Sequence, residues 1–216
     1  MNSTQMKTAI TQRLLLWIGI AVITFGLVGC NALFGSNQYS VKRVSDGDTL
    51  AVTNTKGADF TVRFSCVDAP EVPHSTKEKK SRKALARSQF KWGVKAQNRV
   101  KQLVEQGGSS VTLTITDSDR YGRKVSEVRL RDGTFIQEVL IREGLALIYR
   151  PYLKKCPSAT LVEQAEAEAK QQQRGVWSDS KFVAPWEYRR GGTPVRTKDS
   201  QRSYDSRKPV GDRKSD

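Results

Sequence analysis

The sequence predicts an α+β protein built around a five-stranded OB-fold β-barrel with three helices. Short segments with alternating apolar residues occur as a group of three and then a group of two, a long helical segment separates the groups, and further helical segments follow them. Five short strands interrupted by one helix are typical of a small closed barrel of this type. The chain has 216 residues, which is enough for one domain with a substantial core.

The first group of strands lies between residues 41 and 64. Its three strands are marked by pairs of apolar residues, namely Val41 and Val44, Leu50 and Val52, and Val62 and Phe64. Asp46-Gly47 and residues 54–57 supply turn-forming side chains between them. We therefore expect three short strands joined by tight turns.

A helix and two more strands are expected next. Apolar residues recur at three- and four-residue spacing from Phe90 to Val104, and Gly107-Gly108 ends this helix. The two strands that follow are marked by Val111, Leu113 and Ile115, and by Val125, Val128 and Leu130. Asp132-Gly133 makes the next turn.

Two further helices are expected towards the C-terminus. The first is short, closes at Gly144 and is marked by Ile136, Val139 and Leu140. The second is predicted to start at a capping box formed by Thr160 with Glu163 and to stop at Gly175.

The composition is strongly basic, with 37 Lys and Arg against 22 Asp and Glu and a net charge of +15. Such a surface suits a polyanion, either nucleic acid or an anionic membrane. The run from Lys77 to Lys83 is most simply a solvated loop or helix face. The single histidine, His74, argues against a multi-histidine zinc site. Residues 189–216 are polar and basic, and we expect a disordered tail.

The first 29 residues are predicted to be a signal peptide. The apolar run Leu14–Val28 is shorter than the roughly 20 residues needed to span a bilayer. It ends in Leu27-Val28-Gly29-Cys30, which resembles a bacterial lipobox and implies cleavage before Cys30 and lipid attachment to its thiol. Residues 30–38 would then be the lipidated N-terminus and a spacer. The alternatives are a secreted protein and an uncleaved N-terminal membrane anchor, and all three place the rest of the chain outside the cytoplasm.

If Cys30 carries lipid, Cys66 and Cys156 remain. An even pair of cysteines in an oxidising compartment suggests a disulfide. It would close a long loop, and the chain-entropy model gives a stabilisation of roughly 4–5 kcal/mol. The alternative is two separate buried thiols.

Three short strings hold residues that could perform chemistry, namely Asp46-Gly47-Asp48-Thr49, Arg63–Glu71 and Asp119–Arg123. They supply carboxylates and arginines at turns and strand ends. Hydrolysis of a phosphodiester needs a cation beside the phosphate, a base for the attacking water and fixed positive groups for the transition state. Asp46-Gly47-Asp48 by itself would be no more than a hairpin turn, so the argument depends on the three strings together.

In this order and on these elements, the strings resemble the active site of the staphylococcal nuclease (thermonuclease) family. The resemblance covers about residues 39–178 and implies a nuclease domain over residues 39–188. It also implies cleavage of DNA and/or RNA that leaves 3′-phosphate ends. Three later strings resemble bacterial members of the family: Glu143–Ala146, Gly175–Ser178 and Pro185–Tyr188.

The resemblance further implies that Asp48 and Asp68 bind a cation, with the backbone carbonyl of Ala69 as a third ligand. Two carboxylates brought together repel unless a cation lies between them, and ligation by oxygen alone selects a hard ion. We expect one Ca²⁺ per site, ahead of Mg²⁺. The family's reference member has Thr where this chain has Ala69, and the loss of that hydroxyl could shift the metal affinity.

Glu71 matches the family's glutamate, which acts as general base or orients the attacking water. Arg63 and Arg123 match its arginines, whose paired donors fit phosphate oxygens. Arg63 lies within a predicted strand, and we expect it to point into the cleft because a buried charge needs an anionic partner. Tyr121, Tyr149 and Tyr152 are candidates for substrate binding, although core packing is the simpler account of the last two.

The alternative function is a non-catalytic OB-type lipoprotein that binds nucleic acid. Such a module has no use for Glu71 beside two cation ligands, so the complete set of site residues favours the enzyme. We expect a monomer that is anchored to a membrane through Cys30 and that acts on DNA and/or RNA.

Overall fold

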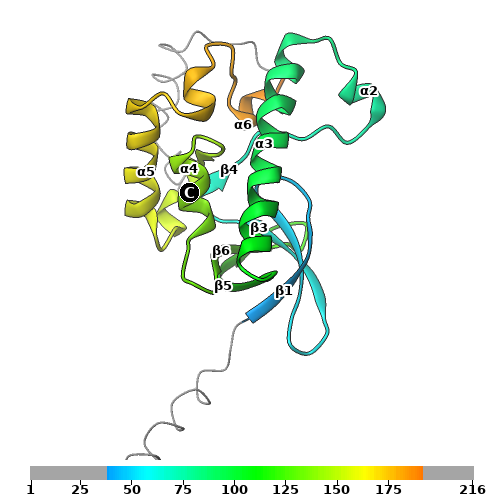
Figure 1. Ribbon diagram of the computed structural model, residues 1–216, viewed down its shortest axis with the longest axis vertical. Helices are drawn as coiled ribbons and strands as arrows, with labels where there is room; N and C mark the ends of the chain where they lie inside the picture. Colours follow the sequence, from blue (N-terminus) through cyan, green and yellow to red (C-terminus); the bar gives the residue numbers. More distant parts are fainter. Residues whose placement is uncertain (1–37, 192–216) are drawn as a thin grey trace, which may run out of the picture. The chain divides into compact units, whose positions relative to one another are not determined.

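A computed structural model describes residues 38–191 (Figure 1). Five strands form a closed barrel in the order β1-β2-β3-β6-β5, so the predicted fold class is confirmed. The strands are β1 (Gln38–Val44), β2 (Thr49–Thr53), β3 (Asp59–Phe64), β5 (Ser110–Ser118) and β6 (Lys124–Leu130). The predicted signal peptide, Cys30 and most of the basic tail lie outside the described residues.

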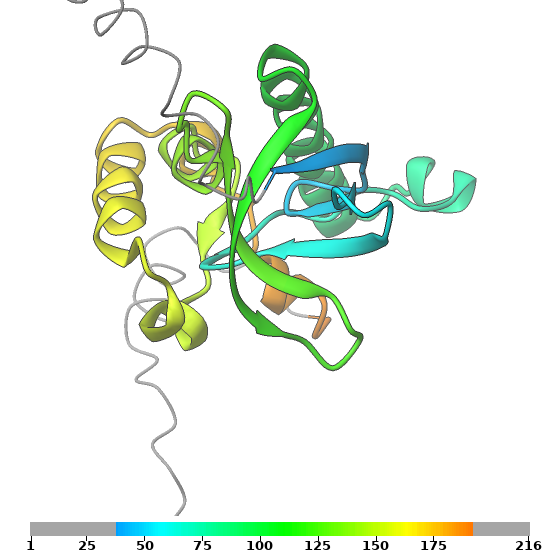
Figure 2. The ribbon, with the colours of Figure 1, turned by 90° about the horizontal axis from the view of Figure 1, so that it is seen from below.

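The barrel is filled by the apolar residues that marked the strands. The side chains of Leu50, Val52, Val62 and Phe64 are all buried, and each contributes about 1.5–3 kcal/mol by leaving water. β3 pairs with β6 in parallel, whereas the other neighbouring strands of the barrel run antiparallel. Figure 2 shows β5 and β6 as a long twisted ribbon whose turn projects away from the other strands.

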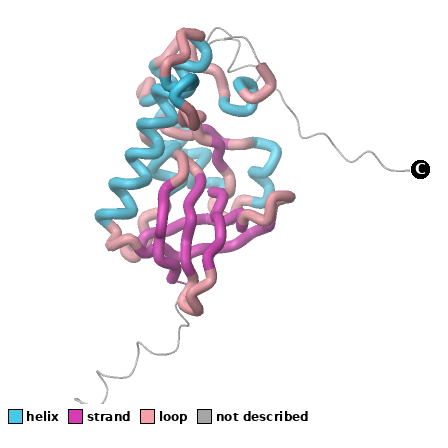
Figure 3. Tube along the Cα trace, turned by 90° about the vertical axis from the view of Figure 1, so that its right-hand side faces the viewer, coloured by secondary structure: helices cyan, strands magenta, loops and turns pink. Residues whose placement is uncertain are grey.

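Helices cover one side and one end of the barrel (Figures 1 and 3). The three longer ones match those predicted, and the described residues also include two short α-helices and two 3₁₀ helices. In chain order they are α2 (Thr76–Lys79), α3 (Ala84–Gln106), α4 (Ile136–Arg142), η1 (Arg150–Lys155), α5 (Ala159–Gln171), η2 (Gly175–Ser178) and α6 (Pro185–Tyr188). The long helix α3 runs along the barrel and ends at Gly107, as predicted.

The predicted start of α5 was wrong. The helix begins after Ser158, and no side chain caps it, so the capping box of Thr160 with Glu163 does not form. Ser158 is held by the buried Glu127 instead, since its N–H and its hydroxyl donate to that carboxylate at 2.7 and 2.9 Å. A contact with a strand far away in the sequence therefore sets where the helix begins.

The end of α5 also comes earlier than predicted. The helix ends at Gln171, because Gln173 adopts a positive φ of 51° before the chain reaches Gly175. Gly175 is itself at a positive φ, and a Cβ there would lie 2.2 Å from the Gly144 carbonyl oxygen. The glycine therefore permits a close approach of two backbones rather than ending the helix.

A small second sheet, absent from the prediction, lies beside the barrel. It consists of β4 (Val67–Asp68) and β7 (Leu147–Ile148), which pair antiparallel. Cys66 precedes β4 and is joined to Cys156 in a disulfide. Within residues 38–191, no helix combines the length and apolar character that crossing a membrane requires.

Candidate active site

Arg63 lies at the centre of the site because of the strand register. On one side it is opposite Thr49, the residue after Asp48, and on the other it is opposite Val125, two residues after Arg123. The Phe64 N–H also donates to the Asp48 carbonyl at 2.8 Å. Strand pairing thus brings together two of the predicted strings, since Asp48 and Arg123 are 75 positions apart in the sequence.

Asp48 is a buried carboxylate with three donors. Its Oδ1 accepts from the Arg63 guanidinium and, at 3.2 Å, from the Thr49 hydroxyl. Its Oδ2 accepts from the Ala69 N–H at 2.7 Å. The residue is only 2% exposed. The backbone N–H of Ala69 therefore lies against the Asp48 carboxylate, while the role of the Ala69 carbonyl as a cation ligand stays a prediction.

Asp68 is the second buried carboxylate, with an exposure of 1%. Arg63 donates to its Oδ1 at 2.6 Å, so one guanidinium joins Asp48 and Asp68. Arg189, from the end of α6, donates to Oδ2 of Asp68 at 2.6 Å. Pairing of β4 with β7 fixes the backbone of Asp68 opposite Leu147.

Burial dominates the electrostatics of these two aspartates. Desolvation raises the pKa of Asp48 to about 6, although Arg63 opposes the shift. Burial, followed by the negative charge of Asp48, raises the pKa of Asp68 as well. The protein therefore holds two carboxylates where their ionisation is costly, an arrangement found more often at functional sites than in structural ion pairs.

Glu71 lies at the rim of the same site. Its carboxylate accepts from Arg189 at 2.7 Å, and its N–H donates to the buried side-chain oxygen of Gln89 at 3.3 Å. The amide of Gln89 also donates to the Val183 carbonyl. Gln89 thus ties the Glu71 backbone both to α3 and to the segment that leads into α6.

Two glycines allow the carboxylate-bearing loops to lie against α3. A Cβ on Gly93 would be 2.0 Å from the Glu71 carbonyl oxygen, and a Cβ on Gly47 would be 2.7 Å from the Cβ atoms of Ala69 and Ala96. Contacts this short do not occur in folded proteins, so both positions need glycine. Their close packing fixes the distance between the helix and the site.

Arg123 comes from the turn between β5 and β6, and Asp119 organises this turn. The carboxylate of Asp119 accepts from the N–H groups of Tyr121 and Arg123 at 2.9 and 3.0 Å, and from Nε of Arg123 at 2.6 Å. Gly122 has a φ of 79°, which glycine adopts without strain. The Tyr121 side chain projects into solvent, with an exposure of 70%.

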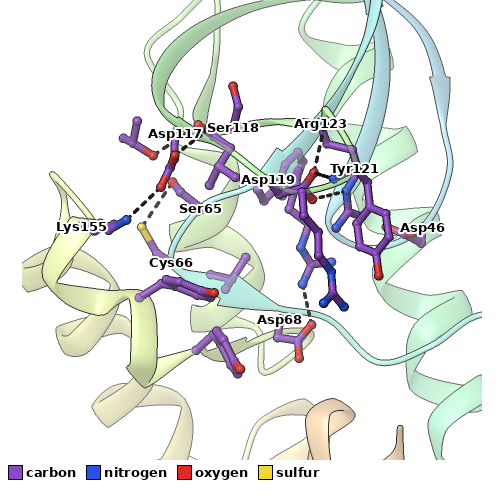
Figure 4. A pocket seen from close by; sticks show the side chains of 18 of the residues that line it. Asp46, Ser65, Cys66, Asp68, Asp117, Ser118, Asp119, Tyr121, Arg123 and Lys155 are labelled. Carbon is purple, nitrogen blue, oxygen red and sulfur yellow. Dashed lines mark hydrogen bonds and ion pairs between the residues drawn. The ribbon is translucent and has the colours of Figure 1, made fainter. Parts of the chain in front are cut away.

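A cleft of about 830 Å³ is lined by Arg63, Asp68, Glu71, Arg123 and Arg189 among others (Figure 4). Asp68 lies at one side of it and Tyr121 and Arg123 lie at another, while Cys66 and Lys155 lie on the side away from Tyr121. Tyr149 and Tyr152 also line the cleft, with ring centroids 5.4 Å apart. Tyr149 packs in addition against Trp186 at 5.6 Å, so it belongs to the core as well as to the cleft wall.

The donor set fits a hard divalent cation. Asp48 and Asp68 are buried and adjacent, and both have positively charged partners. Carboxylate and carbonyl oxygens are the ligands that Ca²⁺ and Mg²⁺ prefer. Within residues 38–191, the group of three side-chain ligand atoms that lie within 4.8 Å of one another is formed by Glu127 with Cys66 and Cys156, and there the two sulfurs are bonded to each other.

A family model described as staphylococcal nuclease homologue matches residues 61–179. The chain belongs to the staphylococcal nuclease family. The predicted family and the predicted enzyme class, a phosphodiesterase, are thereby confirmed.

Curated members of the staphylococcal nuclease family resemble the chain over most of its length. An uncharacterized endonuclease of Escherichia coli O157:H7 is 34% identical over 149 residues, which are 69% of this chain and 82% of the relative. A micrococcal nuclease of Shigella flexneri is 31% identical over 158 residues, covering 69% of this chain and 79% of the relative. Endonuclease YncB of Bacillus subtilis (strain 168) is 34% identical over 152 residues, covering 68% and 64%.

Two residues of this nuclease site were missed in the sequence. Arg189 was placed at the start of the tail, yet its guanidinium reaches Asp68 and Glu71. The signal that could have revealed it is the aromatic string just before it, since Trp186 anchors the segment in the core. Gln89 lies on the buried face of α3, where its spacing from Trp92 and Ala96 could have indicated a buried amide.

Proposed function

We propose that the chain is a cation-dependent endonuclease that hydrolyses DNA and/or RNA outside the cytoplasm. The observation that carries the proposal is the bridge from Arg63 to two buried carboxylates, Asp48 and Asp68, beside a cleft that is lined by Arg63, Asp68, Glu71 and Arg123. A protein that only binds nucleic acid has no need to bury two ionisable carboxylates beside Glu71, the proposed general base.

Asp48, Asp68 and the backbone carbonyl of Ala69 would hold the cation, which we infer to be one Ca²⁺. The cation would neutralise the phosphate and lower the cost of forming hydroxide from water. Calcium is favoured over magnesium because it tolerates irregular oxygen ligation, whereas magnesium demands near-octahedral geometry. Ala69 contributes no hydroxyl, so its role is limited to the backbone.

Glu71 would accept the proton from the attacking water. Its carboxylate is at the rim of the cleft, where a hydrogen bond to water is available. Arg63 and Arg123 would donate to the phosphate oxygens and stabilise the extra negative charge of the five-coordinate transition state. Arg123 donates to Asp119 through Nε and lines the same cleft, where a phosphate would offer charged acceptors to its guanidinium. Tyr121 and Tyr152 are proposed to stack on bases.

We further propose that the nuclease acts at a membrane surface, held by a lipid on Cys30. The disulfide between Cys66 and Cys156 supports an oxidising compartment, because such bonds persist there and are rare in the cytosol. One chain supplies every proposed site residue, which supports a functional monomer. Cell fractionation tests the location: the wild-type protein should sediment with membranes and Cys30→Ser should not, whereas a wholly soluble wild type would indicate a secreted enzyme.

The function is tested with the full-length protein purified in detergent. It should cleave DNA or RNA with Ca²⁺ and stop in excess chelator, and the new ends should carry 3′-phosphates. The Asp68→Asn variant should fold but cleave poorly at the same Ca²⁺ concentration. If the wild type binds nucleic acid with Ca²⁺ present and never cleaves it, the non-catalytic binding module is the correct reading instead.

A further inference from the structure

Arg189 makes three hydrogen bonds to the site carboxylates, one more than Arg63 makes. Its two terminal nitrogens donate to Asp68 at 2.6 and 3.3 Å, and one of them also donates to Glu71 at 2.7 Å. One guanidinium thus joins a proposed cation ligand to the proposed general base. None of the three sequence strings that define the site contains this residue.

The segment that carries Arg189 is firmly attached to the rest of the fold. Trp186 is buried in the core against Tyr149, and the ring of Tyr188 lies 6.3 Å from that of Phe90 on α3. The backbone at Val183 accepts from the buried Gln89. The position of the Arg189 backbone is therefore held by contacts that do not involve its own side chain.

The Arg189 side chain is nevertheless free to leave the carboxylates. It is 45% exposed and lines the cleft, whereas Arg63 is 22% exposed and comes from a central barrel strand. Asp68 keeps a positive partner when Arg189 leaves, because Arg63 donates to its Oδ1 at 2.6 Å. The departure of Arg189 therefore does not leave the buried carboxylate uncompensated.

We propose that Arg189 is a further residue of the active site, which competes with the divalent cation for Asp68 and Glu71. The argument rests on the proposed function, since it takes Asp68 as a cation ligand. A guanidinium and a divalent ion repel each other, and both need the same carboxylate oxygens. Cation binding therefore requires Arg189 to move off Asp68. As a result, the enzyme binds the cation only at a higher cation concentration than it would without this side chain.

Calorimetric titration of the full-length protein with Ca²⁺, in the absence of nucleic acid, tests this directly. The Arg189→Ala variant should bind Ca²⁺ about tenfold more tightly than the wild type, because Oδ2 of Asp68 and the Glu71 carboxylate are freed while Arg63 keeps its contact with Oδ1. The matched control is Arg190→Ala, which removes the same charge from the neighbouring exposed residue. It should stay within about twofold of the wild type, since an exposed charge at a distance is screened.

A second variant guards against a purely structural effect. Arg189→Lys keeps the charge but loses the two-pronged contact, so its Ca²⁺ affinity should lie between those of the wild type and Arg189→Ala. Loss of a structural contact would weaken Ca²⁺ binding or leave it unchanged, and either result for Arg189→Ala overturns the proposal. A wild-type protein that binds no Ca²⁺ would overturn the proposed function together with this inference. If the wild type binds Ca²⁺ and Arg189→Ala binds it no more tightly, only the inference about Arg189 fails.

Discussion

The two walls of the cleft are built differently. The carboxylate wall, formed by Asp68 and Glu71 with Asp48 buried behind them, lies against α3 and depends on contacts between distant parts of the chain. The arginine loop, residues 119–123, is a strand turn held by hydrogen bonds to its own Asp119. The comparison teaches that the cation-binding residues are fixed by the core, whereas the arginine loop can adjust to a substrate.

The two walls also differ in how their charged residues affect the stability of the folded protein. Ionising a buried aspartate destabilises the folded protein, because its pKa is raised above the unfolded value. Holding Arg123 in the loop has no such cost, because Asp119 pairs with it near the surface. We therefore expect changes in the carboxylate wall to alter both stability and activity, and changes in the arginine loop to alter activity alone.

The largest effect is expected from Glu71→Gln. An amide cannot accept the proton of the attacking water, so turnover should fall by about 10²–10⁴-fold. Single-turnover cleavage with saturating Ca²⁺ measures it, and circular dichroism serves as the check on folding. Turnover within a few fold of the wild type would exclude Glu71 as the base.

Arg123→Ala should follow, with turnover lowered by about 10²–10³-fold because a donor to the transition state is lost. The temperature of unfolding should hardly change, since the loop is exposed. The control is Arg131→Ala, an exposed arginine in the next turn, which should keep nearly full activity. Equal losses in the two variants would mean that general positive charge, and not this guanidinium, is what matters.

Gly93→Ala tests the packing behind the carboxylate wall. Alanine normally stabilises a helix relative to glycine by about 1 kcal/mol. Here its Cβ would overlap the Glu71 carbonyl, so we expect a loss of about 1–3 kcal/mol in the free energy of unfolding, together with reduced activity. Denaturant unfolding measures the effect. Asn98→Ala, on the exposed side of the same helix, should be neutral or slightly stabilising.

The last prediction concerns how stability depends on pH. Asp48→Asn removes the cost of ionising a carboxyl with a pKa of about 6, so its free energy of unfolding should gain about 1–3 kcal/mol on the wild type between acid pH and pH 7, beside a pH-independent loss because an amide N–H₂ then faces donors. This relative gain should be absent well below pH 3.8, where the carboxyl is protonated in both states, should grow between about pH 4 and 6, and should level off above pH 6.

Asp132→Asn supplies the control of opposite sign. Hydrogen bonds from Thr134 lower the pKa of this exposed aspartate, so its charge favours the folded state and its replacement should give no gain. Thermal melts between pH 4 and 8 compare the two variants. A gain for Asp48→Asn that did not depend on pH would contradict the assigned cause.

The features that could be predicted from the sequence are those that depend on residues close together along the chain. Alternation identified the barrel strands, and the three strings identified a set of residues that the fold brings into and around one cleft. Arg189 and Gln89 were missed because their partners lie about 120 and 20 positions away, and the local signals near them indicate only burial and not which residue they contact. The start of α5 was missed for the same reason, since Glu127 on β6 holds Ser158.

Calcium titration of two variants, Asp68→Asn and Arg123→Ala, tests the division between the two walls most directly. If the carboxylate wall binds the cation and the arginine loop binds the phosphate, Asp68→Asn should lose Ca²⁺ affinity by at least about tenfold, because it removes a charged ligand. Arg123→Ala should keep the wild-type affinity within about twofold, because its charge is paired with Asp119. Equal Ca²⁺ affinities for the wild type and Asp68→Asn would contradict the account.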